Sequence, residues 1–156
     1  MNLFELRKEF GLSQVEAARI AGMPLRSYVR YEGDNEYGSV LKRKAIIEAI
    51  TEKCEITEEK GILSLEQIRS GVCNVVSKYQ DTVSFCYLFG SYSKGYATEK
   101  SDVDLCVSTT LTGLDYVGLA EEIHLELHKK IDLVRLSNAG SDLINEIMKD
   151  GIKIYG

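Results

Sequence analysis

The segment that most constrains this chain begins at Gly90 and reads GSYSKGYATEKSDVD. It follows Val83–Phe89, an apolar run rich in β-branched and aromatic residues that is typical of a buried strand. Gly90 permits a tight turn in which no Cβ obstructs a phosphate group, and Ser91 with the backbone N–H groups after it can bind that phosphate. Asp102 and Asp104 occupy positions i and i+2 of a second expected strand, so both carboxylates point to one side. The segment therefore predicts a site where carboxylates hold Mg²⁺ against a nucleotide triphosphate.

A third carboxylate is expected on a neighbouring strand, and Asp132 within the segment KIDLV is the candidate. Aspartate is depleted in strands, so an acid flanked by Ile131 and Leu133 favours a functional role over a capping or surface role. Each part of the pattern also has an ordinary interpretation, because Gly-Ser pairs are common and Asp-x-Asp is usually a solvated turn or a strand end. Their combination at one spacing, beside two expected strands, favours the site.

The region from Ser64 onwards alternates between helix and strand patterns. Ser64 and Gln67 form a capping box that opens an amphipathic helix, which continues to Tyr79. After it we expect strands over 83–89, 103–108, 131–136 and 152–155, and helices over 115–129 and 141–149. This alternation predicts a mixed sheet with helices packed on it.

The Gly-Ser pair, the ten residues after it and the Asp-x-Asp resemble the signature of the nucleotidyltransferase superfamily. Residues 64–156 look most like the minimal nucleotidyltransferases, small proteins with a polymerase-β-like catalytic core. In that family a K-x-D-L-V strand supplies the third acid, so the resemblance implies that role for Asp132. It also implies a mixed sheet with packed helices and ATP as the substrate.

Nucleotidyl transfer requires the α-phosphorus to be presented in line to a nucleophile while the charge of pyrophosphate is neutralised. Two metal ions held by shared carboxylates can perform both tasks, so we expect a two-ion Mg²⁺ site. Asp102 and Asp104 are assigned to the metals. Asp132 is assigned to the metal nearer the attacking hydroxyl, and also to the role of its base. Lys94, in the loop between the motifs, either neutralises a phosphate oxygen or is a solvated lysine.

The pattern of the first fifty residues predicts an all-helical unit. Gly11 ends the first helix in a left-handed conformation, Ser13 opens the second helix with a capping box, and Pro24 opens the third. A fourth helix is expected over 40–50, and the polar, acidic residues 51–63 are expected to form a linker. The predicted organisation is therefore a helical domain over 1–50, a linker over 51–63 and an α+β domain over 64–156.

Two short helices joined by a tight turn suggest a helix-turn-helix. The residues Leu12-Ser13-Gln14, Ala18, Gly22 and Arg30-Tyr31-Glu32 resemble the Cro/repressor-like (XRE) pattern, and the resemblance spans residues 2–50. Two positions depart from it. Pro24 stands where the family has a capping Ser or Thr, and Ala17 stands where it has a larger core residue.

The XRE resemblance implies an all-α helix-turn-helix DNA-binding domain. In it Arg26, Ser27 and Arg30 face the major groove, and Gln14 contacts a phosphate. In the other interpretation Arg26 and Arg30 are an i, i+4 pair on a solvated helix face. A single copy should bind DNA weakly, so DNA binding is expected to require dimerisation and a two-fold operator. A homo-oligomer or a hetero-oligomer with a partner protein is the expected assembly.

The charge is unevenly distributed along the chain. Residues 1–50 carry eight Lys and Arg against seven Asp and Glu, a net charge of +1, whereas residues 51–156 carry a net charge of −6. The acidic part is therefore not expected to bind nucleic acid in general, because phosphate contacts dominate such affinity. No apolar run is long enough for a membrane span, and the four cysteines lack zinc spacing, so a reduced cytoplasm is expected.

Only 24 residues follow Asp132, which leaves no room for a domain that seats an antibiotic or an RNA end. The acceptor is therefore expected on another macromolecule. The resemblance implies the antitoxin of a HEPN/MNT toxin–antitoxin pair, which transfers AMP from ATP to a tyrosine of a HEPN ribonuclease toxin, and here also binds operator DNA. Two alternatives remain open: a DNA-binding regulator whose second domain only binds nucleotide or a partner, and a small-molecule nucleotidyltransferase.

Overall fold

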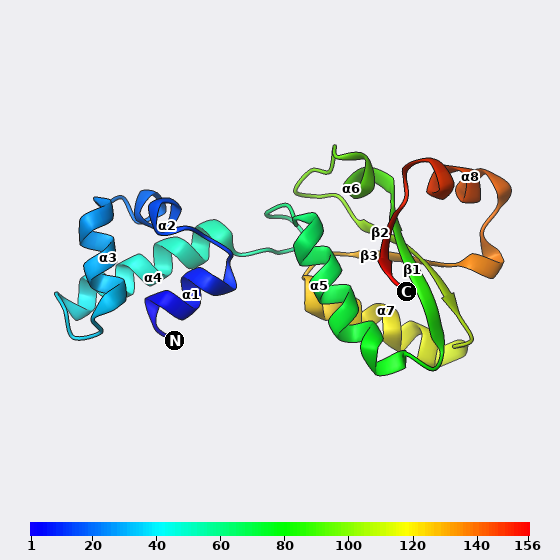
Figure 1. The fold of residues 1–156 in the computed structure, drawn as a ribbon, viewed down its shortest axis with the longest axis horizontal. Coiled ribbons are helices and arrows are strands. Elements are labelled where there is room, and N and C mark those ends of the chain that lie inside the picture. Colours follow the sequence, from blue (N-terminus) through cyan, green and yellow to red (C-terminus); the bar gives the residue numbers. More distant parts are fainter. The chain divides into compact units, whose positions relative to one another are not determined.

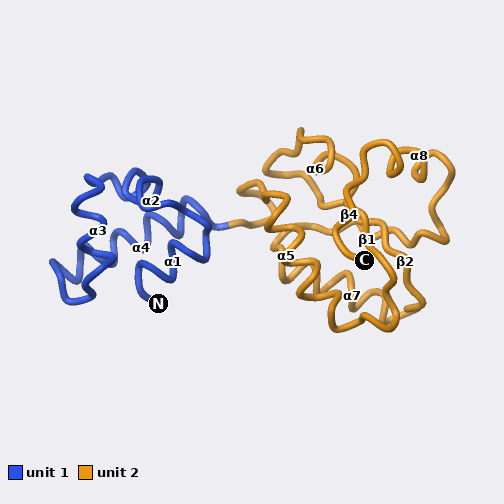
Figure 2. Tube along the Cα trace, in the orientation of Figure 1, with its two compact units in different colours: residues 1–55 blue, residues 56–156 orange.

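The computed structural model describes residues 1–156, which form two compact units, Met1–Glu55 and Ile56–Gly156 (Figure 2). The first unit is entirely helical, and the second combines a four-stranded sheet with helices (Figure 1). The mixed sheet with packed helices that the sequence predicts is present in the second unit.

The first unit contains four helices, α1 (Leu3–Glu9), α2 (Gln14–Ile20), α3 (Leu25–Gly33) and α4 (Val40–Cys54). The expected capping box of Ser13 and the left-handed Gly11, with φ of +64°, are both confirmed. A second capping box at Asn2 opens α1. The helices bury a small core, whose fully or nearly fully buried apolar residues are Leu3, Leu6, Ala17, Ala18, Tyr28, Tyr31, Ile46 and Ile50.

The structure differs from the sequence prediction at the start of α3 and at the end of α4. Pro24 is the N-cap of α3, in extended conformation, and the first helical residue is Leu25. Helix α4 continues to Cys54, because the good helix formers after residue 50 include no breaker. The stretch expected as a linker is thus divided: its first residues are helical, and Leu63 is buried in the core of the second unit.

The second unit begins with α5 (Leu65–Val76), which the expected Ser64 capping box opens and a short 3₁₀ turn follows. Its remaining elements are β1 (Val83–Phe89), α6 (Gly90–Lys94), β2 (Val103–Thr109), α7 (Gly113–Leu127), β3 (Ile131–Arg135), α8 (Ser141–Asp150) and β4 (Ile152–Tyr155). Helix α6 was not expected. Helix α7 ends before 129 because His128 takes a left-handed conformation, with φ of 58°.

The strand order of the sheet is β3-β2-β1-β4. Strand β1 runs antiparallel to β2 and β4, and β2 runs parallel to β3. The end of β1 therefore lies beside the start of β2, which lies beside the start of β3. This topology brings the Gly-Ser loop, the Asp-x-Asp and Asp132 to one end of the sheet.

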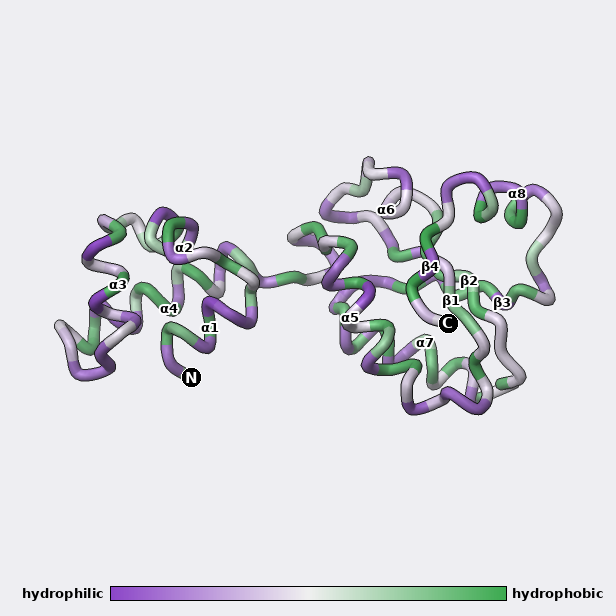
Figure 3. The backbone as a smooth tube through the Cα atoms, in the orientation of Figure 1, coloured by the Kyte–Doolittle hydropathy of each residue, from purple (hydrophilic) through white to green (hydrophobic).

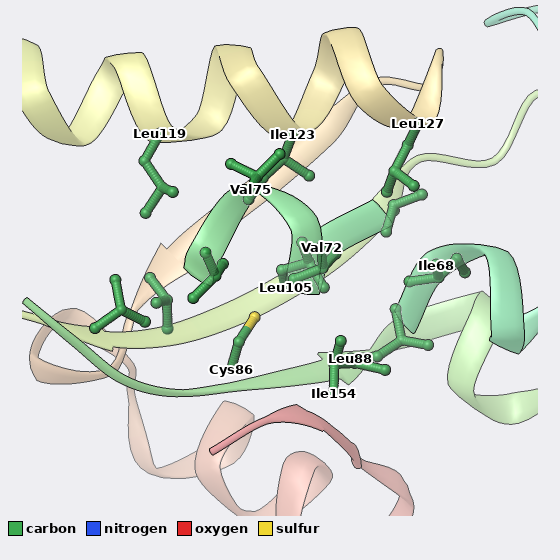
Figure 4. Close-up of a cluster of buried hydrophobic side chains, with 14 of the residues drawn as sticks. Ile68, Val72, Val75, Cys86, Leu88, Leu105, Leu119, Ile123, Leu127 and Ile154 are labelled. Atoms are coloured by element: carbon green, nitrogen blue, oxygen red, sulfur yellow. The ribbon is translucent and has the colours of Figure 1, made fainter. Parts of the chain in front are cut away.

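Helices α5 and α7 cover one face of the sheet, where the main core lies. Side chains of α7 such as Leu119 and Ile123 meet Val72 and Val75 of α5 above the strand residues Cys86 and Leu105 (Figure 4). The strands that contribute to this core are hydrophobic along much of their length (Figure 3). Helix α8 lies on the other side of the strands (Figure 4). None of the helices has the length and apolar character needed to cross a membrane.

Candidate active site

The first two acids of the site are brought together by strand register. Asp104 on β2 is the direct register partner of Asp132 on the parallel strand β3, and it is also the partner of Phe89 at the end of β1. Side chains at paired positions of neighbouring strands lie on the same face of a sheet. The carboxyl groups of Asp104 and Asp132 therefore share one face, at the end of the sheet where the Gly-Ser loop begins.

The third acid, Asp102, is not in the strand as the sequence predicts. Strand β2 begins at Val103, whose N–H donates to the carbonyl oxygen of Lys130 at 2.9 Å, so Asp102 belongs to the loop in front of it. Asp102 nevertheless lies near Asp132, because both line one hollow of about 430 Å³ between α7 and the start of β3. Both of these carboxylates are exposed, whereas Asp104 is half-buried.

The surroundings of Asp104 are electrostatically unfavourable for its charge. Its pKa is raised to about 6, chiefly by burial and then by the neighbouring carboxylates of Asp132, Asp102 and Glu146, in that order of importance. Every charged group that acts on Asp104 is thus another acid. Close carboxylates without a counter-ion are typical of functional sites rather than of stabilising ion pairs.

The chemistry of this donor set fits Mg²⁺, which prefers carboxylate oxygens. A divalent cation would also remove the repulsion that raises the pKa of Asp104. The structure contains no group of three or more His, Cys, Asp or Glu side chains arranged as ligands of one metal ion. The acids therefore share one end of the sheet without forming a preformed ligand cage.

Gly90 is the first residue of α6 and has a left-handed φ of +72°. A Cβ at this position would collide with Oδ2 of Asp104, so the glycine allows the Gly-Ser loop to contact the acid. The sequence predicts the glycine for its approach to a phosphate; the structure shows that its nearest neighbour is Asp104. Ser91 is half-buried beside it, and Oγ of Ser93 donates to the carbonyl oxygen of Gly90 at 3.0 Å.

Lys94 is neither free nor merely solvated. Its Nζ lies 2.6 Å from Oε1 of Glu146 on α8, and the two side chains are 29% and 34% exposed. The hydrogen bond to Glu146 raises the pKa of Lys94. Sequence reasoning missed Glu146, because only the packing of α8 against this end of the sheet brings it to α6.

Lys129 is a second residue that sequence reasoning missed. Its side chain is fully buried, and its Nζ donates to the carbonyl oxygens of Glu99 at 2.6 Å and Lys60 at 3.2 Å. Burial lowers the pKa of Lys129. Because Glu99 stands three residues before Asp102, this lysine fixes the loop that carries the acid.

The four residues predicted to contact DNA lie in the first unit. Arg26, Ser27 and Arg30 are on α3; both arginines are exposed, and Ser27 is half-buried. Gln14 opens α2, and its Nε2 donates to Oε1 of Glu32 at 3.1 Å. The structure therefore groups three of the four on one helix, while Gln14 is hydrogen bonded within the unit.

The comparisons with known proteins concern the second unit. Residues 72–156 match the family model described as polymerase beta, nucleotidyltransferase. The protein adenylyltransferase MntA of Shewanella oneidensis is 35% identical over 72 residues, which are 45% of this chain and 52% of MntA. The chain thus spans about half the length of that relative.

Two solved structures resemble part of this chain. A toxin–antitoxin complex with AMP-PNP contains a chain 27% identical to this one, with a TM-score of 0.51 over 56% of this chain and 73% of the other. A minimal nucleotidyltransferase is 26% identical, with a TM-score of 0.52 over 60% of this chain and 98% of the other. The family model itself covers more than half of the sequence. This chain belongs to the polymerase beta nucleotidyltransferase family.

Proposed function

We propose that this chain is a Mg²⁺-dependent adenylyltransferase antitoxin that transfers AMP from ATP to a tyrosine of a HEPN ribonuclease toxin. The observation that carries the proposal is the pairing of Asp104 with Asp132 on parallel strands, with Asp104 in contact range of Gly90. The relative MntA, whose name describes a protein adenylyltransferase, and the similar toxin–antitoxin complex with AMP-PNP support ATP as the donor and a toxin as the partner.

In this proposal each acid has a defined role. Asp102 and Asp104 would hold Mg²⁺, and Asp132 would lie on the side of the attacking hydroxyl. When bound, Mg²⁺ supplies charge neutralisation at the phosphates. The tyrosine oxygen forms a bond to the α-phosphorus, the bond from that phosphorus to the bridging oxygen of pyrophosphate breaks, and Asp132 takes the hydroxyl proton.

The phosphate-binding role belongs to the loop and helix that follow β1. Gly90 and Ser91 would bind the β- and γ-phosphates. Lys94 would exchange Glu146 for a phosphate oxygen, because a triphosphate carries more negative charge than one carboxylate. This exchange keeps the lysine paired both with and without nucleotide.

We also propose that the first unit is an XRE-like helix-turn-helix that binds operator DNA. The supporting observation is that α3, which follows α2 after a four-residue connection, carries Arg26 and Arg30 on its exposed surface. Arginines on an exposed recognition helix suit guanine edges and phosphates. The predicted phosphate contact of Gln14 would require it to leave Glu32.

The transferase proposal is tested by incubating the full chain with α-labelled ATP, Mg²⁺ and the product of the gene adjacent to its own. We expect label on a tyrosine of that protein, and loss of the label with Asp104→Asn. Asp81→Asn is the matched control, because Asp81 is an exposed loop acid outside the site. Tight operator binding without any transfer would instead support the regulator, and label on a small molecule alone would support the third alternative.

A further inference from the structure

The connection between α6 and β2 carries Asp102, and hydrogen bonds hold this loop on both sides of the acid. The N–H of Ser101 donates to the carbonyl oxygen of Thr98 at 3.0 Å, and Oγ of Ser101 accepts from the N–H of Thr98 at 2.8 Å. On the other side, the N–H of Val103 donates to the carbonyl oxygen of Lys130 at 2.9 Å. The backbone around Asp102 is therefore fixed, although loops are ordinarily more mobile than the strands that they connect.

Lys129 holds the same loop from inside the second unit. Its side chain is fully buried, and its Nζ donates to the carbonyl oxygen of Glu99 at 2.6 Å, a short charge-assisted hydrogen bond. Burying an ammonium group costs free energy that an apolar side chain of similar length would not cost. In return for that cost, Lys129 is bonded to the loop that carries Asp102.

The other hydrogen bond of Lys129 reaches the turn Thr57–Lys60, which precedes α5. Nζ donates to the carbonyl oxygen of Lys60 at 3.2 Å, and the same oxygen accepts from the N–H of Thr57 at 2.9 Å. Next to the turn, the N–H of Gly61 donates to Oε1 of Glu99 at 3.1 Å, so the turn and the loop lie side by side (Figure 1). Lys129, Glu99 and residues 57–61 thus form one hydrogen-bonded cluster, which we call the clamp.

The segment that contains the turn also contacts the two helices nearest to the acids. Oε1 of Glu58 lies 2.9 Å from Nε2 of His124 on α7. The N–H of Leu63 donates to the hydroxyl oxygen of Tyr92 on α6 at 3.4 Å, and the side chain of Leu63 is buried in the core. The clamp is therefore attached to α6 and α7 as well as to the loop of Asp102.

Mg²⁺ demands near-octahedral geometry at short oxygen distances, so a carboxylate that binds it must be held in place. Asp104 and Asp132 are held by paired strands, whereas Asp102 lies in a loop. We propose that Lys129 is a positioning residue of the active site, which acts through the clamp to hold Asp102 where Mg²⁺ binds it together with Asp104. This inference rests on the proposed transferase function, since it concerns metal binding by the same acids.

The first experiment measures Mg²⁺ affinity without turnover. The full chain, ¹⁵N-labelled, is titrated with MgCl₂ alone, and the amide signals of Asp102 and Asp104 are followed. Lys129→Met is expected to raise the Kd for Mg²⁺ by about 10- to 100-fold, as is typical when a partner that orients a metal ligand is removed. Lys78→Met is the matched control and should keep the wild-type Kd, because Lys78 is 69% exposed and pairs with Glu122.

The second experiment follows the clamp itself. Coupling between two sites acts in both directions, so Mg²⁺ that binds Asp102 should also stabilise the clamp. We expect Mg²⁺ to slow hydrogen exchange at the N–H of Gly61 and to leave the N–H of Thr82, which donates to the carbonyl oxygen of Tyr79 elsewhere in the unit, unchanged. The response at Gly61 should disappear in Asp102→Asn. Equal exchange at Gly61 with and without Mg²⁺ would overturn the proposal.

A second variant covers the case in which Lys129→Met fails to fold. Glu99 is exposed, so Glu99→Ala should keep the thermal midpoint close to the wild-type value while it removes the acceptor of the Gly61 N–H. We expect its Kd for Mg²⁺ to rise by about fivefold, the scale of one net hydrogen bond. The effect is smaller than that of Lys129→Met because the bond from Lys129 to the carbonyl oxygen of residue 99 remains. An unchanged Kd in Glu99→Ala would contradict the clamp.

The outcomes distinguish this inference from the proposed function. A lysine that only stabilises the fold would lower the thermal midpoint and leave the Kd for Mg²⁺, measured well below that midpoint, unchanged. If the wild-type chain binds Mg²⁺ and Lys129→Met binds it equally well, only the positioning role is overturned. If the wild-type chain neither binds Mg²⁺ nor labels an acceptor, the transferase proposal fails, and the positioning role fails with it.

Discussion

Glu32 in the first unit has a buried carboxylate and Asp104 in the second a half-buried one, and the surroundings of the two are opposite. Glu32 accepts hydrogen bonds from Arg7 at 2.7 and 2.9 Å and from Gln14 at 3.1 Å. The bond from Arg7 is the main cause that lowers its pKa. Asp104 has other carboxylates as its charged neighbours, and its pKa is raised to about 6, chiefly by burial.

The difference separates a carboxylate that stabilises the fold from one that serves a site. Glu32 is satisfied entirely by groups of its own unit, so nothing further needs to bind there. Asp104 is placed by the fold at a cost in stability, because its charge is buried among like charges. Such a carboxylate is stabilised when a metal cation or a proton joins it.

The sharpest test of this comparison exchanges each carboxylate for its amide. We expect Asp104→Asn to lower transfer by about 10³-fold or more, the scale of losing several kcal/mol of transition-state charge stabilisation. The same variant should have a higher thermal midpoint than the wild type, because it removes a repelled charge. Glu32→Gln should do the reverse, with a lower midpoint and unchanged transfer. If both amides lower the midpoint, the distinction between the two carboxylates fails.

The next effect concerns the counter-ion of Glu32. Arg7→Met leaves a carboxylate without its partner at a site where both side chains are at most 10% exposed. We expect the first unit to lose about 3 kcal/mol of stability, as is typical when one partner of a buried ion pair is removed. Denaturant titration followed by the amide signals of α1 and α3 measures this. Lys44→Met is the control, since its pair with Glu48 spans 4.0 Å and is exposed; an equal loss there would contradict the assignment.

Acid should act on the two units in opposite directions. The lowered pKa of Glu32 contributes stability that is present above its ordinary value of 4.5 and is lost as the pH falls through the folded-state pKa. The raised pKa of Asp104 contributes stability that is present below 3.8 and is lost as the pH rises through about 6. Amide hydrogen exchange without Mg²⁺ should show stronger protection of β2 at pH 4.5 than at pH 7, and weaker protection of α1–α3 once the pH falls below the folded-state pKa of Glu32. A β2 response that persists in Asp104→Asn would contradict this explanation.

The smallest expected effect concerns Glu146. It is the weakest of the charged neighbours that raise the pKa of Asp104, so Glu146→Gln should lower that pKa only slightly. Asp132→Asn, which removes the strongest charged neighbour, should lower it more. A carboxyl ¹³C titration of Asp104 in each variant measures both shifts. An effect of Glu146→Gln that equals or exceeds that of Asp132→Asn would contradict the order of the neighbours.

The features that were predicted from the sequence alone depend on residues that are close together along the chain. The four strands of the second unit follow runs of apolar residues, and the capping boxes at Ser13 and Ser64 follow from pairs three residues apart. The Gly-Ser and Asp-x-Asp spacing predicted that these segments meet, and the structure places Gly90 against Asp104 at one end of the sheet. Asp102 was misplaced because β2 begins only where its backbone pairs with Lys130, a partner that no local pattern identifies.

The missed contacts of charged side chains depend on partners far along the chain. Glu146 is 52 residues from Lys94, Lys129 is 30 residues from Glu99, and Glu32 is 25 residues from Arg7. Charged residues at such separations look alike in a sequence, whether they are solvated or paired. Only the packed fold distinguishes them.

The pairing of β2 with β3 ties the candidate active site to the fold in one respect. If one residue were removed from the turn around His128, strand alternation would move the acid at 132 toward α7 and bring Ile131 or Leu133 to the solvent side. Such a molecule would lose packing and chemistry at the same time. A variant that retains the buried side of β3 therefore also retains its carboxylate beside Asp104, so natural selection for a stable fold preserves the alignment of the site.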